Sequence, residues 1–150
     1  MHCFNTGYSK VFLAGVITGL IGVLFPADAV EASPVLEKLL NEYAVAAKRE
    51  NPAFSAFNAE AGRELYHLKR RHSQKNEILS CSTCHTENPR NMGQTTAGKP
   101  IDPLSPAANP KRLTDEEEIR KWFKRNCTQV LERECTPIEK GNFLHFLLNS

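Results

Sequence analysis

The chain has 150 residues, a formal net charge of +2 and 41% hydrophobic residues, which is the size and composition of a single globular domain. The nearly balanced charge offers no strongly basic surface, so a nucleic-acid partner is not expected. No internal repeat is present, and a repeat architecture is therefore excluded.

The first thirty residues have the layout of a secretory signal. Lys10 precedes fifteen uncharged residues, Val11 to Phe25, and Pro26 ends the run. Two cleavage patterns with small residues follow within residues 27–32, as they do in export signals. Because fifteen residues fall short of the ~20 that a membrane-spanning helix needs, a cleaved signal is favoured over an uncleaved membrane anchor.

Cleavage after Ala32 would leave residues 33–150 as the mature domain. The formal net charge would rise from +2 to +3, because one basic and two acidic residues leave with the signal. Cys3 leaves as well, so four of the five cysteines remain. An even number of cysteines in an exported protein favours pairing. We therefore expect a signal peptide over residues 1–32 and a periplasmic or otherwise exported protein.

Two helices are predicted before the central cysteine motif. Ser33 followed by Pro34 is a typical helix start, and the Asn51-Pro52 pair ends that helix. A second helix is expected from about Asn58 to Arg71. The stretch from Lys69 to Asn76 is basic and polar, which indicates a solvated loop.

A long irregular segment is predicted after the cysteine motif. Residues 88–110 contain five prolines and two glycines, and such a composition disfavours regular structure. More than twenty residues without an element are unusual inside a compact domain. A large bound group around which the segment wraps would account for it. A disordered linker is the alternative, but Ile101 and Leu104 give the segment apolar side chains to bury.

Two helices close the chain. Thr114 with Glu117 forms a capping box that predicts the start of the first. The second begins at another capping box, Thr136 with Glu139. Four residues of the earlier helix share one face at helical spacing: Ile119, Trp122, Phe123 and Asn126. No strand pattern is found, so an all-α fold is expected.

The central motif is Cys81-Ser82-Thr83-Cys84-His85, the attachment motif of c-type haem. Its two thiols add across the porphyrin vinyl groups, and His85 is then held under the iron as the proximal ligand. A redox-active cysteine pair and half of a zinc site are the alternatives. The first needs the strands of a thioredoxin-like fold, and the second needs two more ligands at suitable spacing. One covalently bound haem c is therefore predicted.

A methionine downstream of the proximal histidine is the usual second axial ligand of an electron-transfer cytochrome c. This chain has only Met1 and Met92. Met1 lies in the predicted signal. Met92 follows His85 by seven residues, which leaves little slack for a chain of ~3.3–3.6 Å per residue to pass round the haem edge. Ordinary methionine ligation is therefore not expected.

Other side chains are candidates for the second axial position. His145 lies in the terminal helix, where a packing histidine is more common than a ligand. His67 and His72 lie in or beside the basic stretch and are expected to be solvated. Asn126 lies on an apolar helix face downstream of the haem motif, from which a distal ligand would come. The pattern alone, however, favours a helix-end cap for Asn126.

Cys127 and Cys135 form a second pair, eight positions apart across a short bend. In an oxidising compartment a disulfide is the default, and two free thiols are the alternative. The bond would hold the end of one helix against the start of the last one.

Gly62-Arg63-Glu64-Leu65-Tyr66, followed by the haem motif and an aromatic final helix, resembles the class I cytochromes c. In that fold the first and last helices cross and pack through a small residue and an aromatic one. The resemblance implies four to five helices around one covalent haem, with a long proline-rich loop.

Three further stretches resemble the sphaeroides-haem-protein (SHP) family, which is also catalogued as a domain of unknown function. They are Gly98 to Pro106 (GKPIDPLSP), Trp122 to Cys127 (WFKRNC) and Arg133 to Lys140 (RECTPIEK). The similarity spans roughly residues 34–148, which is nearly the whole predicted mature chain.

The family resemblance implies a distal ligand and a disulfide. The ligand is the asparagine directly before the first disulfide cysteine, here Asn126, and the disulfide corresponds to Cys127 and Cys135. An amide oxygen is a weak ligand that tolerates ferric iron better than ferrous iron. Members of the family that resemble this chain release it on reduction, which opens a site for oxygen, nitric oxide or carbon monoxide.

The resemblance also suggests redox partners, namely a dihaem cytochrome c and a membrane b-type cytochrome. The chain departs from the family in a longer basic insert from Lys69 to Lys75, which bears on how such a partner docks.

Three functional classes stay open at this point. The first is an electron carrier whose sixth iron position is filled in both redox states. The second is an enzyme that turns over oxygen, nitric oxide or another small nitrogen compound at an opened iron. The third is a gas-binding or sensing module without turnover. The missing methionine counts against the first class in its pure form and does not separate the other two.

Overall fold

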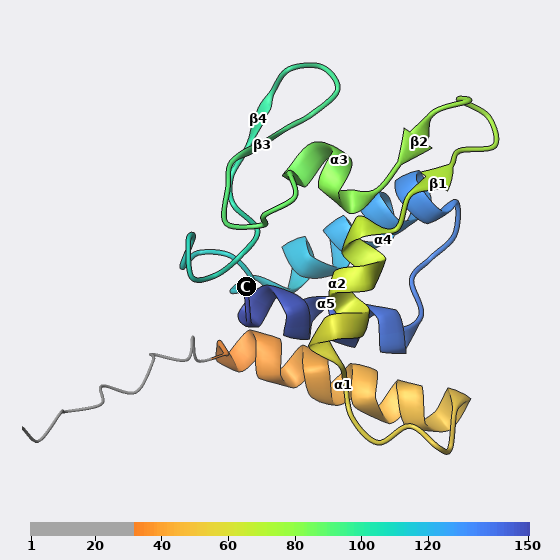
Figure 1. Cartoon of the computed structure of the whole chain (residues 1–150). Coiled ribbons are helices and arrows are strands. Elements are labelled where there is room, and N and C mark those ends of the chain that lie inside the picture. Colours follow the sequence, from red (N-terminus) through yellow and green to blue (C-terminus); the bar gives the residue numbers. More distant parts are fainter. Residues whose placement is uncertain (1–31) are drawn as a thin grey trace, which may run out of the picture.

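The computed structural model describes residues 32–150, and this part of the chain is mainly helical (Figure 1). Within these residues there are five helices, at α1 Pro34–Glu50, α2 Ala59–His67, α3 Cys81–His85, α4 Glu116–Leu131 and α5 Pro137–Leu148. Two antiparallel pairs of two-residue strands complete the elements: β1 Arg70–Arg71 with β2 Ile78–Leu79, and β3 Gly93–Gln94 with β4 Pro100–Ile101. Two residues are too few to show alternation, and the sequence therefore gave no strand signal.

Helix ends follow the local sequence signals in α1 and α5. The Ser33 hydroxyl accepts a hydrogen bond from the Leu36 amide at 3.2 Å, and Pro34 occupies the first turn. In α5, Thr136 and Glu139 form the predicted capping box, in which the Thr136 amide donates to the Glu139 carboxylate at 2.8 Å. These bonds satisfy backbone amides of the first turn, which have no hydrogen-bond acceptor inside the helix.

Helix α4 begins one residue later than predicted. Its N-cap is Asp115, whose carboxylate accepts from the Glu118 amide at 3.0 Å. Thr114 instead donates its hydroxyl to the Lys111 carbonyl at 2.9 Å and closes the preceding turn. The predicted Thr114 cap is therefore wrong, because an aspartate stands next to it and takes the capping role.

Helix α2 ends at His67, so the predicted continuation to Arg71 is wrong. Leu68 has extended backbone angles, and the basic stretch after it forms a hairpin of β1 and β2 instead of an open loop. His72 lies in this hairpin and is only 8% exposed, which corrects the expectation that it is solvated. Its Nδ1 lies 3.5 Å from the carboxylate of Glu132, at the end of α4.

The crossing of α2 and α5 depends on glycine. A Cβ atom at Gly62 would lie 2.0 Å from the Asn142 carbonyl oxygen and 2.9 Å from the Phe146 Cβ. Gly141, on α5, is covered by the Phe57 ring, whose nearest carbon would lie 2.1 Å from an added Cβ. Figure 1 shows the two helices crossing below α3 in this view. The absence of a side chain at Gly62 lets the backbones of the two helices approach each other, and its absence at Gly141 makes room for the Phe57 ring.

The apolar core forms around this crossing. Helix α1 buries Leu36, Leu39 and Tyr43 against Ile119 of α4 and Leu144 of α5. Each such side chain contributes about 1.5–3 kcal/mol when fully buried. A second cluster packs around Tyr66, and a third contains the cysteines of the C-terminal half. The core therefore packs the two terminal helices, α1 and α5, against the part of the chain that contains the haem motif.

The export signal predicted at residues 1–32 falls almost entirely on residues 1–31, which lie outside the described part of the chain. Among residues 32–150, none of the helices is both long enough and apolar enough to span a bilayer.

Candidate haem site

The haem motif folds as one short helix because hydroxyl groups hold its first turn. Ser80 has extended backbone angles and precedes the helix, and its amide donates to the Thr83 hydroxyl at 2.9 Å. The Ser80 hydroxyl lies 2.9 Å from that of Ser82 and 3.0 Å from that of Thr83. Residues three apart share one side of a helix, so this turn brings Cys81 and Cys84 to the same side.

Helix α2 fixes the end of the motif through one buried hydroxyl. Tyr66 is completely buried, and its hydroxyl donates to the carbonyls of His85 and Thr86, at 2.9 and 2.7 Å. Thr86 has a φ of 64°, a left-handed conformation that is unfavourable for a residue with a side chain. The two hydrogen bonds therefore hold a turn that the local sequence disfavours.

The strand β3 closes the motif from the other side. A Cβ at Gly93 would lie 2.1 Å from the Cys84 carbonyl oxygen and 3.0 Å from the His85 Cα. Only glycine allows the backbone to approach this closely. The sequence showed Gly93 as one of several turn residues and gave no sign of this contact.

An apolar cluster adjoins Cys81. Its buried members are Tyr66, Phe146 and Leu147, and partly buried Cys81, Leu104, Leu113 and Phe143 pack against them. Leu104 belongs to the irregular segment 88–110, which folds back because the Leu104 and Ser105 amides both donate to the Pro89 carbonyl, at 2.8 and 3.1 Å. The segment therefore contributes a side chain to the site, as its apolar residues predicted.

Burial also determines the charge of the motif side chains. It lowers the pKa of His85 to about 4, and the nearby Arg112 guanidinium adds to this effect. Burial raises the pKa of the Cys81 thiol to about 11. The imidazole is therefore neutral at ordinary pH, which is the form that binds a metal.

These residues fit a covalently bound haem. Cys81 and Cys84 are free thiols, while Cys127 and Cys135 are joined in a disulfide with an S–S distance of 1.99 Å. The two free thiols would form the thioether bonds to the porphyrin. His85, directly after Cys84, would supply a neutral imidazole, and the apolar cluster beside Cys81 would provide a dry surface for the porphyrin. The donor set therefore fits a c-type haem, for which His85 would be the proximal ligand.

The proposed distal ligand, Asn126, lies on α4 directly before Cys127. It is partly buried, and its amide side chain has no hydrogen-bond partner within residues 32–150. One turn earlier on α4, Phe123 packs edge-on against Phe143, with ring centroids 5.7 Å apart. Phe143 also packs against Tyr66 at 6.1 Å. A chain of aromatic contacts therefore connects the helix of Asn126 with the residue that holds His85.

The other candidate ligands lie in different surroundings. His145 packs against Phe57, with ring centroids 5.7 Å apart. Nδ1 of His67 lies 3.0 Å from the Glu87 carboxylate. Met92 is 58% exposed. Among residues 32–150, no three His, Cys, Asp or Glu side chains are gathered as a metal site.

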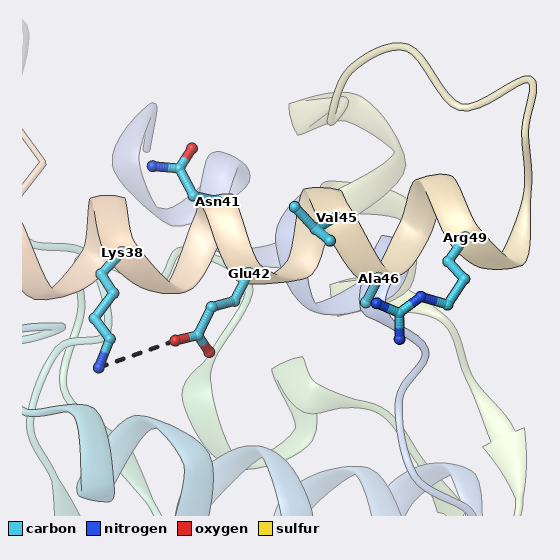
Figure 2. Close-up of a pocket in the computed structure, with 6 residues that line it drawn as sticks. All are labelled: Lys38, Asn41, Glu42, Val45, Ala46 and Arg49. Atoms are coloured by element: carbon cyan, nitrogen blue, oxygen red, sulfur yellow. Dashed lines mark ion pairs between the residues drawn. The ribbon is translucent and has the colours of Figure 1, made fainter.

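The surface hollows lie outside the haem motif or at its edge. A hollow of about 680 Å³ lies along α1 and is lined by residues of that helix, among them Lys38 and Glu42 (Figure 2). The ammonium of Lys38 lies 3.9 Å from the Glu42 carboxylate. A second hollow of about 420 Å³ is lined by Ser82 of the motif together with Arg63, His67, Lys69 and Glu87.

The crossing of an early helix with the last helix, the C-x-x-C-H turn and the apolar cluster beside it define a class I c-type cytochrome with one haem. The chain belongs to the family described as "Domain of unknown function (DUF1924)", whose model matches residues 52–147.

Two characterised relatives agree with this family. Cytochrome c'' from Methylophilus methylotrophus is 36% identical over 133 residues, which cover 88% of this chain and 92% of the relative. The cytochrome c-type protein SHP from Cereibacter sphaeroides is 40% identical over 120 residues, 80% of this chain and 92% of the relative. Both are c-type cytochromes, and the cofactor of this protein is accordingly one covalently bound haem c.

Solved structures share the fold. Oxidized cytochrome c'' from Methylophilus methylotrophus superposes with a TM-score of 0.70 and 35% identity, over 76% of this chain and 93% of that one. Oxidized SHP, which is described as an oxygen binding cytochrome c, superposes with a TM-score of 0.69 and 35% identity, over 80% of this chain and all of that one. The all-α, class I cytochrome c fold and the SHP-type family predicted from the sequence are confirmed.

Proposed function

We propose that this protein is an exported one-electron carrier whose sixth iron ligand, the amide of Asn126, is released on reduction. The released position then accepts a small diatomic molecule such as oxygen, nitric oxide or carbon monoxide. The observation that carries the proposal is the position of Asn126, a weak neutral donor without another partner among residues 32–150, directly before the disulfide of α4.

The bound haem supplies an iron that changes by one electron between the ferric and ferrous states and takes ligands on two faces. Cys81 and Cys84 would hold the group by thioether bonds. His85 would bind from one face, with its backbone held by Tyr66. Asn126 would be the second and weaker ligand, because a neutral amide oxygen prefers the harder ferric ion to the ferrous one.

Two relatives support ligand release and gas binding. One solved structure is described as an oxygen binding cytochrome c. Another, of cytochrome c'' from Methylophilus methylotrophus, is described as giving insights into the structural basis of haem-ligand detachment. The redox partners proposed for this chain are a dihaem cytochrome c and a membrane b-type cytochrome, as the family resemblance suggests.

The test compares Asn126→Ala with Asn41→Ala as the matched control, since Asn41 is exposed on α1. We expect Asn126→Ala to change the ferric absorption spectrum and to leave the ferrous spectrum as in the wild type, because the amide has already left the ferrous iron. Cyanide should also bind the ferric variant about ten-fold faster or more, since it no longer competes with the amide.

Asn41→Ala should leave both spectra unchanged. A ferric spectrum that Asn126→Ala does not alter would reject Asn126 as the ligand. A change in both redox states would instead indicate a ligand that stays bound, and the protein would then be an electron carrier with a permanently filled sixth position.

A further inference from the structure

The net positive charge of the described chain is concentrated in one hairpin. Residues 69–77 contain the cations Lys69, Arg70, Arg71 and Lys75 and the single carboxylate Glu77, which gives this segment a net charge of +3. Residues 32–150 as a whole also carry +3, because residues 1–31 hold one basic and two acidic residues of a chain with net charge +2. The rest of the described surface is therefore neutral overall.

The cations of this basic hairpin are exposed and free of ion pairs. All four are exposed, and none belongs to an ion pair found within residues 32–150. Some basic residues elsewhere do pair with carboxylates: Arg120 pairs with Glu116 at 2.9 Å and Arg133 pairs with Glu139 at 2.6 Å. The hairpin thus presents four cations that form no direct ion pair within residues 32–150.

The basic hairpin is anchored to the fold. Glu132, the left-handed cap of α4 with a φ of 58°, accepts hydrogen bonds from the amide of Ser73, at 3.0 Å, and from its hydroxyl. The same carboxylate lies 3.5 Å from Nδ1 of the buried His72. These contacts hold the hairpin against the end of α4, so its charge occupies a fixed place on the molecule.

The basic hairpin also adjoins the haem motif. Its second strand leads through Ser80 directly into Cys81, and Lys69 lines the 420 Å³ hollow together with Ser82 of the motif. Two apolar side chains flank the charges, Leu68 at 45% exposure and Ile78 at 57%. An apolar contact within a ring of charge is the usual composition of a transient protein interface.

We propose that the basic hairpin is the docking surface for an acidic redox protein, which rests on the proposed electron-transfer function. The partner loses one electron, the haem iron goes from ferric to ferrous, and no covalent bond forms. Charge complementarity selects the partner and raises the rate of encounter. A protein is favoured over a lipid surface because the charge adjoins the redox motif, where an electron donor must bind.

The test uses reduced flavodoxin, an acidic one-electron donor protein, and follows reduction of the ferric holoprotein by stopped flow. Lys69→Glu/Lys75→Glu removes hairpin charge without touching His72 or Ser73. Arg49→Glu/Lys111→Glu is the matched control, because both residues are exposed outside the hairpin and the net charge changes equally. At low ionic strength we expect the hairpin variant to react about ten-fold more slowly than the control.

The difference between the two variants should disappear in ~1 M salt, where charges are screened within about 3 Å. Equal rates for hairpin and control variants would overturn the docking proposal. Binding of the wild type to anionic phosphatidylglycerol vesicles, lost in the hairpin variant while the flavodoxin rates stay equal, would assign the hairpin to a membrane instead. Dithionite must reduce every variant, and a holoprotein that it does not reduce would reject the electron-transfer function itself.

Discussion

The hydroxyl of Tyr66 joins the first half of the chain to the haem motif. It donates to two carbonyls, those of His85 and Thr86, while the ring packs against Phe146 with centroids 5.3 Å apart. Burial raises the pKa of this hydroxyl above its usual range, so it remains a donor at all working pH values. A phenylalanine keeps the ring contacts and removes only the donor.

We predict that Tyr66→Phe lowers the free energy of unfolding by about 1–3 kcal/mol, because two carbonyls lose their donor. Tyr43→Phe is the control: Tyr43 is also buried, and its ring packs edge-on against Phe123. Urea denaturation of both holoproteins measures the difference. If Tyr66→Phe were no less stable than Tyr43→Phe, the two hydrogen bonds would not stabilise the turn of the motif.

The sequence identified some residue roles and missed others. The C-x-x-C-H spacing and the Thr136 capping box are local patterns, and a local pattern is visible without the fold. The surroundings of His72 are not visible in this way, because they include Glu132, which lies sixty positions away in the sequence. Gly93 likewise looks like a turn residue until β3 is seen against the Cys84 carbonyl.

At the scale of elements, the crossing of α2 and α5 is the most constrained contact. Gly62 faces backbone, whereas Gly141 faces the ring of Phe57. A Cβ added at Gly62 can be accommodated only if the two helices move apart. A Cβ added at Gly141 can be accommodated if the Phe57 ring, which lies in a loop, rotates. The two glycines therefore differ in how strictly they are required.

We predict that Gly62→Ala is destabilising by about 1–3 kcal/mol or more. This outcome is opposite to intrinsic propensity, since alanine is better than glycine in a helix by about 0.5–1 kcal/mol. Gly141→Ala should cost less. Denaturation midpoints followed by far-ultraviolet circular dichroism would rank the two variants, and a stabilised Gly62→Ala would contradict the close approach of the helices.

Element boundaries were harder to predict than element types. Four of the five helices correspond to helices predicted from the sequence, whereas α3 was predicted only as the haem motif. Helix α2 ends four residues before its predicted limit, at His67. The basic residues that follow are compatible with a helix. They form a hairpin because Glu132 binds Ser73 from a distant part of the chain, a tertiary contact that propensity does not encode.

At the scale of the whole molecule, the long segment 88–110 packs beside the haem motif. Residues 88–110 contain one pair of two-residue strands, yet Leu104 packs beside Cys81. A long loop with little regular structure is stabilised when it covers a large group. The composition of this segment predicts that it wraps a large bound group, and the covalently bound haem c would be that group.

The central claim is that the sixth position opens on reduction. The most direct measurement is the absorption spectrum of the purified wild-type holoprotein, ferric and then ferrous, with carbon monoxide added anaerobically. We predict a high-spin ferrous spectrum that shifts promptly with carbon monoxide, because Asn126 has left the iron. A sharp low-spin ferrous spectrum that carbon monoxide does not change would contradict this account and would indicate a strong, permanent sixth ligand.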